Sequence, residues 1–147
     1  MIDIKAPSVA DAPAISALLE SLGYPATESF MQKRLTQLLS HQDEVLLVAV
    51  DDGKVVGVIS LHFIPQLALV GDFCRISYFC VSEASRGAGI GALLEARAVA
   101  VAQQRGCDRI EVHSHARRTD AHRFYYRQGY LDSPKYLIRS LADQPGR

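Results

Sequence analysis

The amino-acid sequence predicts a mixed α+β fold that forms one domain over residues 1–147. Patterns typical of strands and helices follow one another in the order β-α-α-β-β-β-α-β-α-β. An Asp-Gly turn signal within residues 51–54 joins two strand patterns directly, as in an antiparallel hairpin. A glycine-rich segment then links a third strand pattern to a helix, and no repeat or flexible linker divides the chain. Together these observations indicate one α+β domain with a strand–loop–helix–strand unit near its centre.

The first third of the chain is expected to hold a short strand and two helices. Residues 2–6 alternate weakly, and Ser8 or Asp11 is expected to cap a helix that ends at Gly23. A second amphipathic helix is predicted over residues 28–40. Its apolar side is expected to carry Phe30, Leu35, Leu38 and Leu39.

The rest of the chain alternates between strands and helices. Strands are predicted over residues 44–50, 55–63 and 73–82, a helix from Ile90 to about Gly106, a strand over 109–113, a helix over 121–128 and a last strand over 136–141.

Composition excludes several classes of protein. The longest apolar run, Val45–Val50, is far shorter than the roughly 20 residues that a membrane helix needs. The first residues lack the basic and apolar regions of a secretory signal. Three cysteines without a C-x-x-C pair indicate a reduced protein without a structural zinc site. The expectation is therefore a cytoplasmic protein that contacts no membrane.

The net charge of zero hides a difference between the two halves of the chain. Residues 1–73 carry four basic and nine acidic side chains, whereas residues 74–147 carry twelve basic and seven acidic ones. Eleven of those twelve are arginines, whose planar fork suits carboxylates and phosphates. The second half is therefore predicted to meet an anion. Because the whole chain is neutral, a nucleic-acid partner is not expected.

The segment from Arg86 to Ala92, with the sequence RGAGIGA, lies between a predicted strand and a predicted helix. A helix N-terminus presents unpaired backbone N–H groups and a partial positive charge. Glycines let phosphate oxygens approach these groups, and Arg86 adds a charged donor. A tight turn alone would need fewer than three alternating glycines, so the segment is interpreted as a phosphate-binding loop.

Two sequence patterns bear on which phosphate compound the loop binds. The pattern G-x-x-x-x-G-K-[ST] is absent, which excludes a Walker A loop. Residues 87–92 do fit the dinucleotide pattern G-x-G-x-x-[GA], with Glu111 about 20 residues further on. A dinucleotide-dependent oxidoreductase is therefore one alternative, although the preceding hairpin and the short remaining chain fit it poorly.

Two motifs together resemble the GNAT superfamily of acetyl-CoA-dependent N-acetyltransferases. Val81 followed by Arg86–Gly91 fits the family's R/Q-x-x-G-x-G/A signature. The segment AHRFYYRQGY, residues 121–130, is similar to the family's A-x-x-F-Y-x-x-x-G-[FY] segment. The order of the remaining elements also matches, so the resemblance covers nearly the whole chain. It implies a mostly antiparallel, twisted sheet flanked by helices and splayed at the cofactor cleft.

The resemblance also implies site residues. The strand from Phe79 to Val81 would pair with the pantetheine arm of acetyl-CoA, and a backbone N–H there would polarise the thioester carbonyl. Tyr125 would protonate the departing thiolate, and its neighbour Tyr126 is the alternative. Arg118 stands where many relatives carry an asparagine near the coenzyme. The pyrophosphate would be held by Arg86, Gly87, Ala88, Gly89, Ile90, Gly91 and Ala92.

A general base is harder to assign. Histone-type relatives carry a glutamate in the strand before the loop, whereas this chain has Arg75, which cannot act as a base at neutral pH. His113 is the expected base because a histidine pKa suits the task. The alternatives are His115, His62 and Glu83, or a water that carries the proton to solvent.

The sequence thus predicts an N-acetyltransferase that uses acetyl-CoA and no metal. An amine of a small molecule or a peptide would attack the thioester directly. A non-catalytic acyl-CoA sensor of the same fold is the principal alternative, because Arg75 replaces the glutamate base. Dimers through the sheet edge or the C-terminal strand are common among relatives, so a homodimer is one expectation for the assembly.

Overall fold

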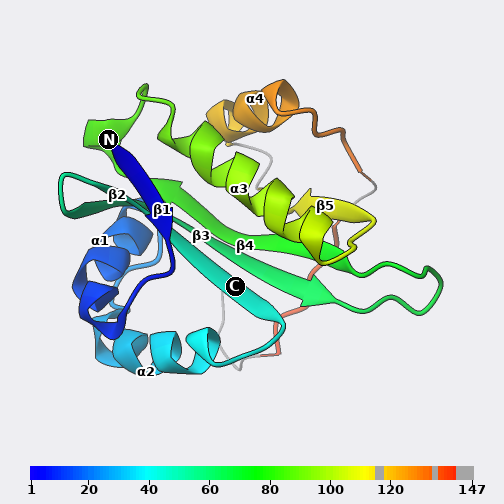
Figure 1. Ribbon diagram of the computed structural model, residues 1–147, viewed down its shortest axis with the longest axis horizontal. Coiled ribbons are helices and arrows are strands. Elements are labelled where there is room, and N and C mark those ends of the chain that lie inside the picture. Colours follow the sequence, from blue (N-terminus) through cyan, green and yellow to red (C-terminus); the bar gives the residue numbers. More distant parts are fainter. Residues whose placement is uncertain (115–117, 134–135, 142–147) are drawn as a thin grey trace. The chain divides into compact units, whose positions relative to one another are not determined.

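A computed structural model describes residues 1–114, 118–133 and 136–141, and it divides into the units Met1–Val112 and His113–Arg147. The first unit contains a five-stranded sheet, three α-helices and two short 3₁₀ turns (Figure 1). Its elements are β1 (Ile2–Lys5), η1 (Val9–Asp11), α1 (Ala12–Leu22), α2 (Glu28–Leu39), β2 (Glu44–Asp51), β3 (Lys54–Ile64), β4 (Phe73–Val81), η2 (Glu83–Ser85), α3 (Ile90–Gln104) and β5 (Arg109–Val112). The described part of the second unit contains α4 (Thr119–Arg127).

The sheet has the strand order β1-β2-β3-β4-β5. All neighbouring pairs are antiparallel except β4 and β5, which run parallel. The predicted hairpin joins β2 to β3, where Asp52 and Gly53 take the left-handed φ values of 50° and 76° that such a turn requires. One parallel pair requires a crossover, and α3 provides it. The mixed α+β fold predicted from the sequence is therefore confirmed.

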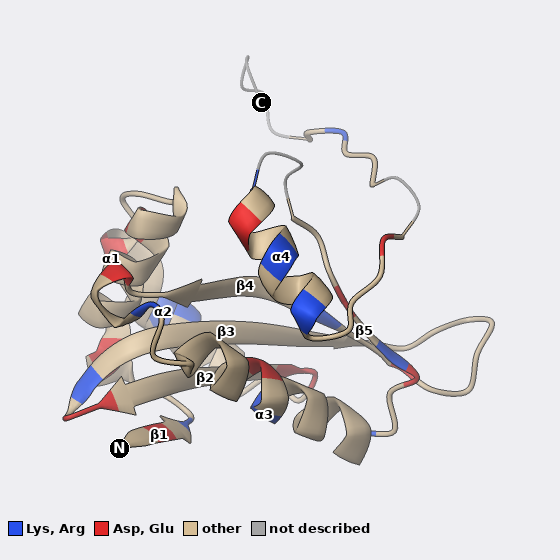
Figure 2. Ribbon diagram, turned by 90° about the horizontal axis from the view of Figure 1, so that it is seen from above, with Lys and Arg blue, Asp and Glu red and all other residues tan. Residues whose placement is uncertain are grey.

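Helices cover both faces of the sheet. On one face, α1 and α2 bury an apolar cluster that includes Ile15, Leu35, Val48 and Cys80. On the other face, α3 comes so close that a Cβ added at Gly57 would lie 2.9 Å from a methyl group of Leu94. Figure 2 shows α1 and α3 on opposite sides of the sheet. Gly57 therefore allows α3, and with it the loop before α3, to sit directly on β3.

The helix ends follow the sequence signals, with one difference. Gly23 ends α1 with a φ of 110°. Asp11 is the N-cap residue of α1, whereas Ser8 begins the preceding turn η1, where its amide donates to the Asp11 carboxylate over 2.8 Å. On α2 the buried side chains are Met31 and Leu35. The predicted apolar side was partly wrong, because Phe30 and Leu39 are exposed.

The strand predicted over residues 136–141 is absent: these described residues have no strand structure. Tyr136, Leu137, Ile138 and Leu141 are exposed there, by 58% to 93%. A run of apolar residues forms a strand only where a partner strand completes its hydrogen bonds, and no ladder to this segment is present among the described residues.

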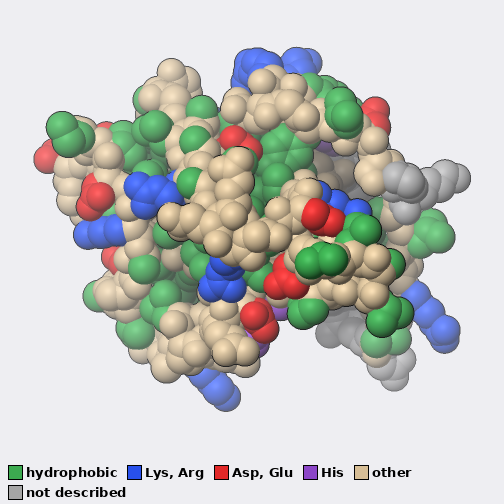
Figure 3. Space-filling model, turned by 45° about the vertical axis from the view of Figure 1, so that its right-hand side comes forward, with side chains coloured by type: hydrophobic (Ala, Val, Ile, Leu, Met, Phe, Trp, Pro, Cys, Tyr) green, Lys and Arg blue, Asp and Glu red, His purple; other side chains and the backbone are tan. Residues whose placement is uncertain are grey.

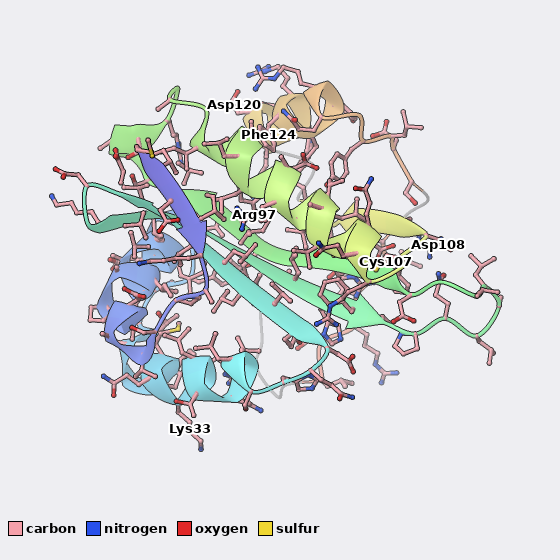
Figure 4. All side chains as sticks on the ribbon, viewed as in Figure 1. Lys33, Arg97, Cys107, Asp108, Asp120 and Phe124 are labelled. Atoms are coloured by element: carbon pink, nitrogen blue, oxygen red, sulfur yellow. The ribbon has the colours of Figure 1, made fainter. Side chains whose placement is uncertain are left out.

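The difference in charge between the two halves of the sequence does not produce one basic surface on the face shown in Figure 3. On that face, Lys and Arg side chains alternate with Asp and Glu. Arg97, labelled in Figure 4, reaches from α3 to the Ile4 carbonyl of β1 at 3.5 Å. None of the helices in the described ranges is long and apolar enough to cross a bilayer.

Candidate active site

The two parallel strands part near the middle of β4. Their ladder runs from Phe73 opposite Arg109 to Ile76 opposite Val112 and ends there. Beyond Ile76, β4 continues along β3 to Val81, with Ser77 as the extra residue of a β-bulge. Phe79 and Val81, the predicted pantetheine-binding positions, are half-buried and lie opposite Ile59 and Gly57 of β3. β5 itself ends at Val112, so beyond Ile76 the edge of β4 that faced β5 has no partner strand among the described residues, along the stretch that was predicted to bind the cofactor.

The glycine loop follows this strand after the short turn η2. Gly87 and Gly89 have φ values of 87° and 78°, in the left-handed region that favours glycine. A Cβ added at either position would meet no heavy atom within 4 Å. The loop therefore needs glycine for its backbone conformation, and it leaves open space where side chains would otherwise stand.

Backbone amides of the loop are available as donors. Gly89 is the N-cap residue of α3, and the amide of Leu93 donates to its carbonyl over 3.1 Å. Within the described chain, the amides from Gly87 to Ala92 donate to no backbone carbonyl. Ile90 is only 2% exposed and anchors the helix start in the core, whereas Arg86 is exposed at the loop entrance. These residues fit a pyrophosphate, because the amides and the helix N-terminus border open space and Arg86 lies at the loop entrance.

A row of charged side chains crosses the sheet just before the strands part. Glu44 of β2 lies opposite His62 of β3, His62 opposite Arg75 of β4, and Arg75 opposite Glu111 of β5. His62 Nδ1 lies 2.6 Å from Glu44 Oε1. Arg75 donates through Nε and Nη2 to Glu111 Oε1 over 3.0 and 2.8 Å. We call these four residues, together with Arg109, the cross-strand row.

Arg109 completes the cross-strand row at the edge of the sheet. Its Nε lies 3.6 Å from Glu111 Oε2. The guanidinium groups of Arg75 and Arg109 both lie over the ring of Phe73, at 5.5 and 5.0 Å from its centroid. Glu111, which the dinucleotide alternative needs for a ribose, is thus engaged by two arginines. This engagement and the antiparallel hairpin both disfavour a dinucleotide fold.

Two tyrosines, one from the α1–α2 loop and one from β4, contact each other. Tyr24, between α1 and α2, and Tyr78 of β4 contact each other edge-to-face with centroids 5.3 Å apart. Both are partly exposed, by 49% and 43%.

Glu83, one of the alternative bases, lines an open cavity of about 620 Å³ together with residues of α1 and of the β2–β3 hairpin.

The second unit holds the predicted acid. Tyr125 is 8% exposed and lies against Phe124 and Tyr130, with centroids 5.5 and 5.4 Å away. Tyr126 is half exposed, and its hydroxyl donates to Asp132 over 2.5 Å. That hydrogen bond to Asp132 is the main reason why the pKa of Tyr126 is raised above its ordinary value.

The other predicted residues of this unit lie at its start. The ring of His113 lies 4.3 Å from that of Tyr136, centroid to centroid. Arg118 is exposed and is the N-cap residue of α4. His115 lies outside the described residues. The structure thus places Phe79, Val81 and the glycine loop together in the first unit, and His113, Arg118 and Tyr125 in the second.

Sequence reasoning missed several residues of the site region. Glu44, Phe73 and Arg109 carry no motif, and only the strand register shows which partners they meet. Tyr24 also carries no motif, and its contact with Tyr78 depends on the tertiary packing of the α1–α2 loop. The described residues hold no cluster of three or more side chains that could bind a metal ion.

Known proteins resemble this chain in both sequence and fold. Residues 13–130 match the model of the acetyltransferase (GNAT) family. An aminoalkylphosphonate N-acetyltransferase from Salmonella typhimurium is 40% identical over 94 residues, which are 64% of this chain. The matched part is 61% of that relative's length.

Two solved structures, both below 25% identity, support the fold. A transcriptional regulator from Bacillus halodurans C-125 superposes with a TM-score of 0.87 at 23% identity, covering 96% of this chain and 100% of the other. A GNAT family acetyltransferase from Staphylococcus aureus gives 0.81 at 22%, covering 95% and 98%. Because the family model matches most of the chain, and the fold and the glycine loop agree with it, this chain belongs to the GNAT acetyltransferase family.

Proposed function

We propose that this protein transfers the acetyl group of acetyl-CoA to the primary amine of a small molecule. One observation carries the proposal: β4 separates from β5 at Ile76 and leads directly into a loop with two left-handed glycines and free amides. A parted strand edge suits an extended pantetheine arm, and the loop suits the pyrophosphate that follows it. Arg118, exposed at the start of α4, would add a phosphate contact.

The proposed reaction is a direct attack. The amine nitrogen forms a bond to the thioester carbonyl carbon, and the C–S bond breaks to release the thiolate of coenzyme A. A backbone N–H of the strand from Phe79 to Val81 would polarise the carbonyl oxygen in the transition state. His113 would take one proton from the ammonium group so that the neutral amine can attack, and Tyr125 would give its proton to the thiolate. The nitrogen loses a second proton as the C–S bond breaks, and this proton restores the Tyr125 hydroxyl. Two protons thus leave the nitrogen, one proton reaches sulfur, and the proton on His113 passes to solvent.

Tyr125 is preferred over Tyr126 as the acid. The hydroxyl of Tyr126 is already bound to Asp132, which also raises its pKa and makes it a weaker proton donor. Tyr125 is buried among aromatic rings, where solvent does not compete for a proton. His62, whose ring contacts Glu44, is the alternative to His113 as the base.

The acceptor is proposed to be a small amine rather than a peptide. The Salmonella typhimurium relative bears the name of an enzyme that acts on aminoalkylphosphonates, which are small amines. At 40% identity over about three fifths of that protein, the name supports the same class of acceptor for this chain.

A thiol-release screen tests the proposal. Purified protein and acetyl-CoA are mixed with aminoalkylphosphonates, amino acids, polyamines, aminoglycosides or a peptide with a free N-terminus, and free coenzyme A is measured. Thiol release that depends on a small amine is the expected result, with the acetylated amine identified by mass spectrometry. Acetyl-CoA binding without thiol release for any acceptor would contradict the proposal and favour the acyl-CoA sensor.

A further inference from the structure

We propose that Arg75, Arg109 and Glu111 form the part of the acceptor site that binds an anionic group, so that the preferred acceptor is an amine carrying a phosphonate-like anion. This inference rests on the proposed acetyl transfer. It adds the residues that recognise the acceptor and the chemical class that they select.

The position of the cluster is the first argument. Arg75 and Glu111 form the second-to-last pair of the β4–β5 ladder, one residue before the strands part at Ile76 and Val112. The thioester is proposed to lie along β4 beyond that point. Arg75 lies four residues before Phe79 along β4, about 13 Å at the backbone. The long side chain of Arg75 and a short aminoalkyl anion bound to it would together span this distance.

The charge of the cluster is the second argument. Two guanidinium groups share a single carboxylate, so Arg75, Arg109 and Glu111 together carry one net positive charge. His62 and Glu44 continue the row on the far side of Arg75. Glu44 lies two strands from β4, about 10 Å away, and contacts His62, so it does not neutralise the second arginine.

The free donors are the third argument. A guanidinium has five N–H donors, and Arg75 gives only its Nε and Nη2 to Glu111. Arg109 makes one contact with Glu111 at 3.6 Å, which is longer than an ordinary hydrogen bond. Their side chains are 37% and 52% exposed, so both can reach a bound molecule. A tetrahedral dianion has more acceptor oxygens than a single carboxylate, so it suits hydrogen bonds from two guanidinium groups better.

The orientation of the cluster is fixed before any anion binds. Phe73 lies under both guanidinium groups, and Glu111 holds Arg75 by two hydrogen bonds to one oxygen. Groups held in place in advance lose less entropy on binding. An ion pair with Glu111 that only stabilised the fold would need one arginine. Arg109, the second arginine, is instead exposed and weakly paired.

Acceptor selectivity tests the inference. We would measure kcat/KM for 2-aminoethylphosphonate and for propylamine, which has a similar length and no anion. The wild-type protein is expected to prefer the phosphonate by about 100-fold or more, since each charge-assisted hydrogen bond contributes roughly a factor of ten or more. Arg109→Gln should reduce this preference by about tenfold or more, chiefly through KM. Arg75→Gln should act in the same direction, and Arg75→Lys should restore part of the preference.

Arg105→Gln is the matched control. Arg105 is also an exposed arginine over a phenyl ring, 4.2 Å from the centroid of Phe63, but Phe63 lies on the sheet face that carries α3. Its removal should leave the preference unchanged. Equal use of both amines by the wild-type protein, or an equal loss of preference in Arg105→Gln, would overturn the inference.

A binding measurement separates this inference from the proposed function. Methylphosphonate has no amine, so its binding to the wild-type protein and to Arg109→Gln can be titrated whether or not acetyl transfer occurs. Weaker binding to Arg109→Gln supports the anion site even if no amine is acetylated. Equal binding to both proteins refutes the anion site while leaving acetyl transfer to a neutral amine intact.

Discussion

Gly89→Ala is the substitution that examines the glycine loop most closely. Gly89 has a φ of 78° at the start of α3, and a Cβ there would stand in open space. The substitution therefore changes two things separately: it strains the backbone of the free protein, and it places a methyl group where the proposed pyrophosphate would lie. Gly106 has a φ of 74°, just beyond the opposite end of α3, and it too has no atom within 4 Å of an added Cβ. Gly106→Ala is thus a matched control.

The two substitutions should lower the free energy of unfolding by nearly the same amount. An alanine in the left-handed region costs about 1–2 kcal/mol, and neither position adds a clash. The melting temperature of each variant should therefore fall by roughly 2–8 °C. Their effects on acetyl-CoA binding should differ. Loss of one or two amide–phosphate hydrogen bonds, at about 1.5–3 kcal/mol each, should raise the Kd of Gly89→Ala by about tenfold to about 20,000-fold. Gly106 lies about 24 Å from Gly89 along the helix, so the Gly106→Ala variant should bind acetyl-CoA normally.

Thermal unfolding and isothermal titration with coenzyme A measure the two effects independently. The loop assignment predicts equal losses of stability and a loss of affinity in Gly89→Ala alone. It would be refuted if both variants bound coenzyme A as tightly as the wild-type protein while losing the expected stability. A loss of affinity in Gly106→Ala would likewise show that the effect comes from general strain.

Three further predictions concern other parts of the chain. Tyr125→Phe should lower kcat by about 100-fold or more with little change in coenzyme affinity, whereas Tyr126→Phe should keep most of the turnover; unchanged turnover in Tyr125→Phe would remove it from the mechanism. Gly57→Ala should destabilise the protein by about 1–3 kcal/mol in urea, because its Cβ would lie 2.9 Å from Leu94, and an unaffected free energy of unfolding would contradict that packing. Burial first, and a neighbouring thiol second, raise the pKa of Cys74 from 9.0 to about 12, so the unfolded chain loses this proton at lower pH than the folded chain. Relative to Cys74→Ala, the free energy of unfolding should therefore be constant below about pH 9 and fall by about 1.4 kcal/mol per pH unit from there to about pH 12, as urea titrations at several pH values would show.

The sequence predicted the order and the approximate bounds of the elements from β1 to α4. The spacing of apolar residues, the glycines at helix ends and the Asp-Gly turn are local signals that can be read without knowing the tertiary structure. The sequence also predicted the family correctly and the place of the glycine segment between β4 and α3, whereas the role of that segment in binding phosphate stays a prediction. The last strand was predicted wrongly, because the apolar residues 136–141 carry no information about whether a partner edge exists.

The cross-strand row could not be predicted, because two β-bulges set its register. From the hairpin turn, an uninterrupted ladder would put Glu44 opposite Leu61, but the shift after Val50 leaves Val56 as an extra residue and brings Glu44 opposite His62. A second bulge at Ser77 brings His62 opposite Arg75. A single-residue shift turns a side chain to the other face, so the meeting of these charges depends on features that no local pattern reveals.

Equilibrium binding of acetyl-CoA tests the central claim most directly, because the proposed reaction and acceptor site both depend on the cofactor. We would titrate the wild-type protein with acetyl-CoA and, separately, with NAD by isothermal titration calorimetry. The account predicts micromolar binding of acetyl-CoA and no binding of NAD. Binding of NAD without binding of acetyl-CoA would contradict it.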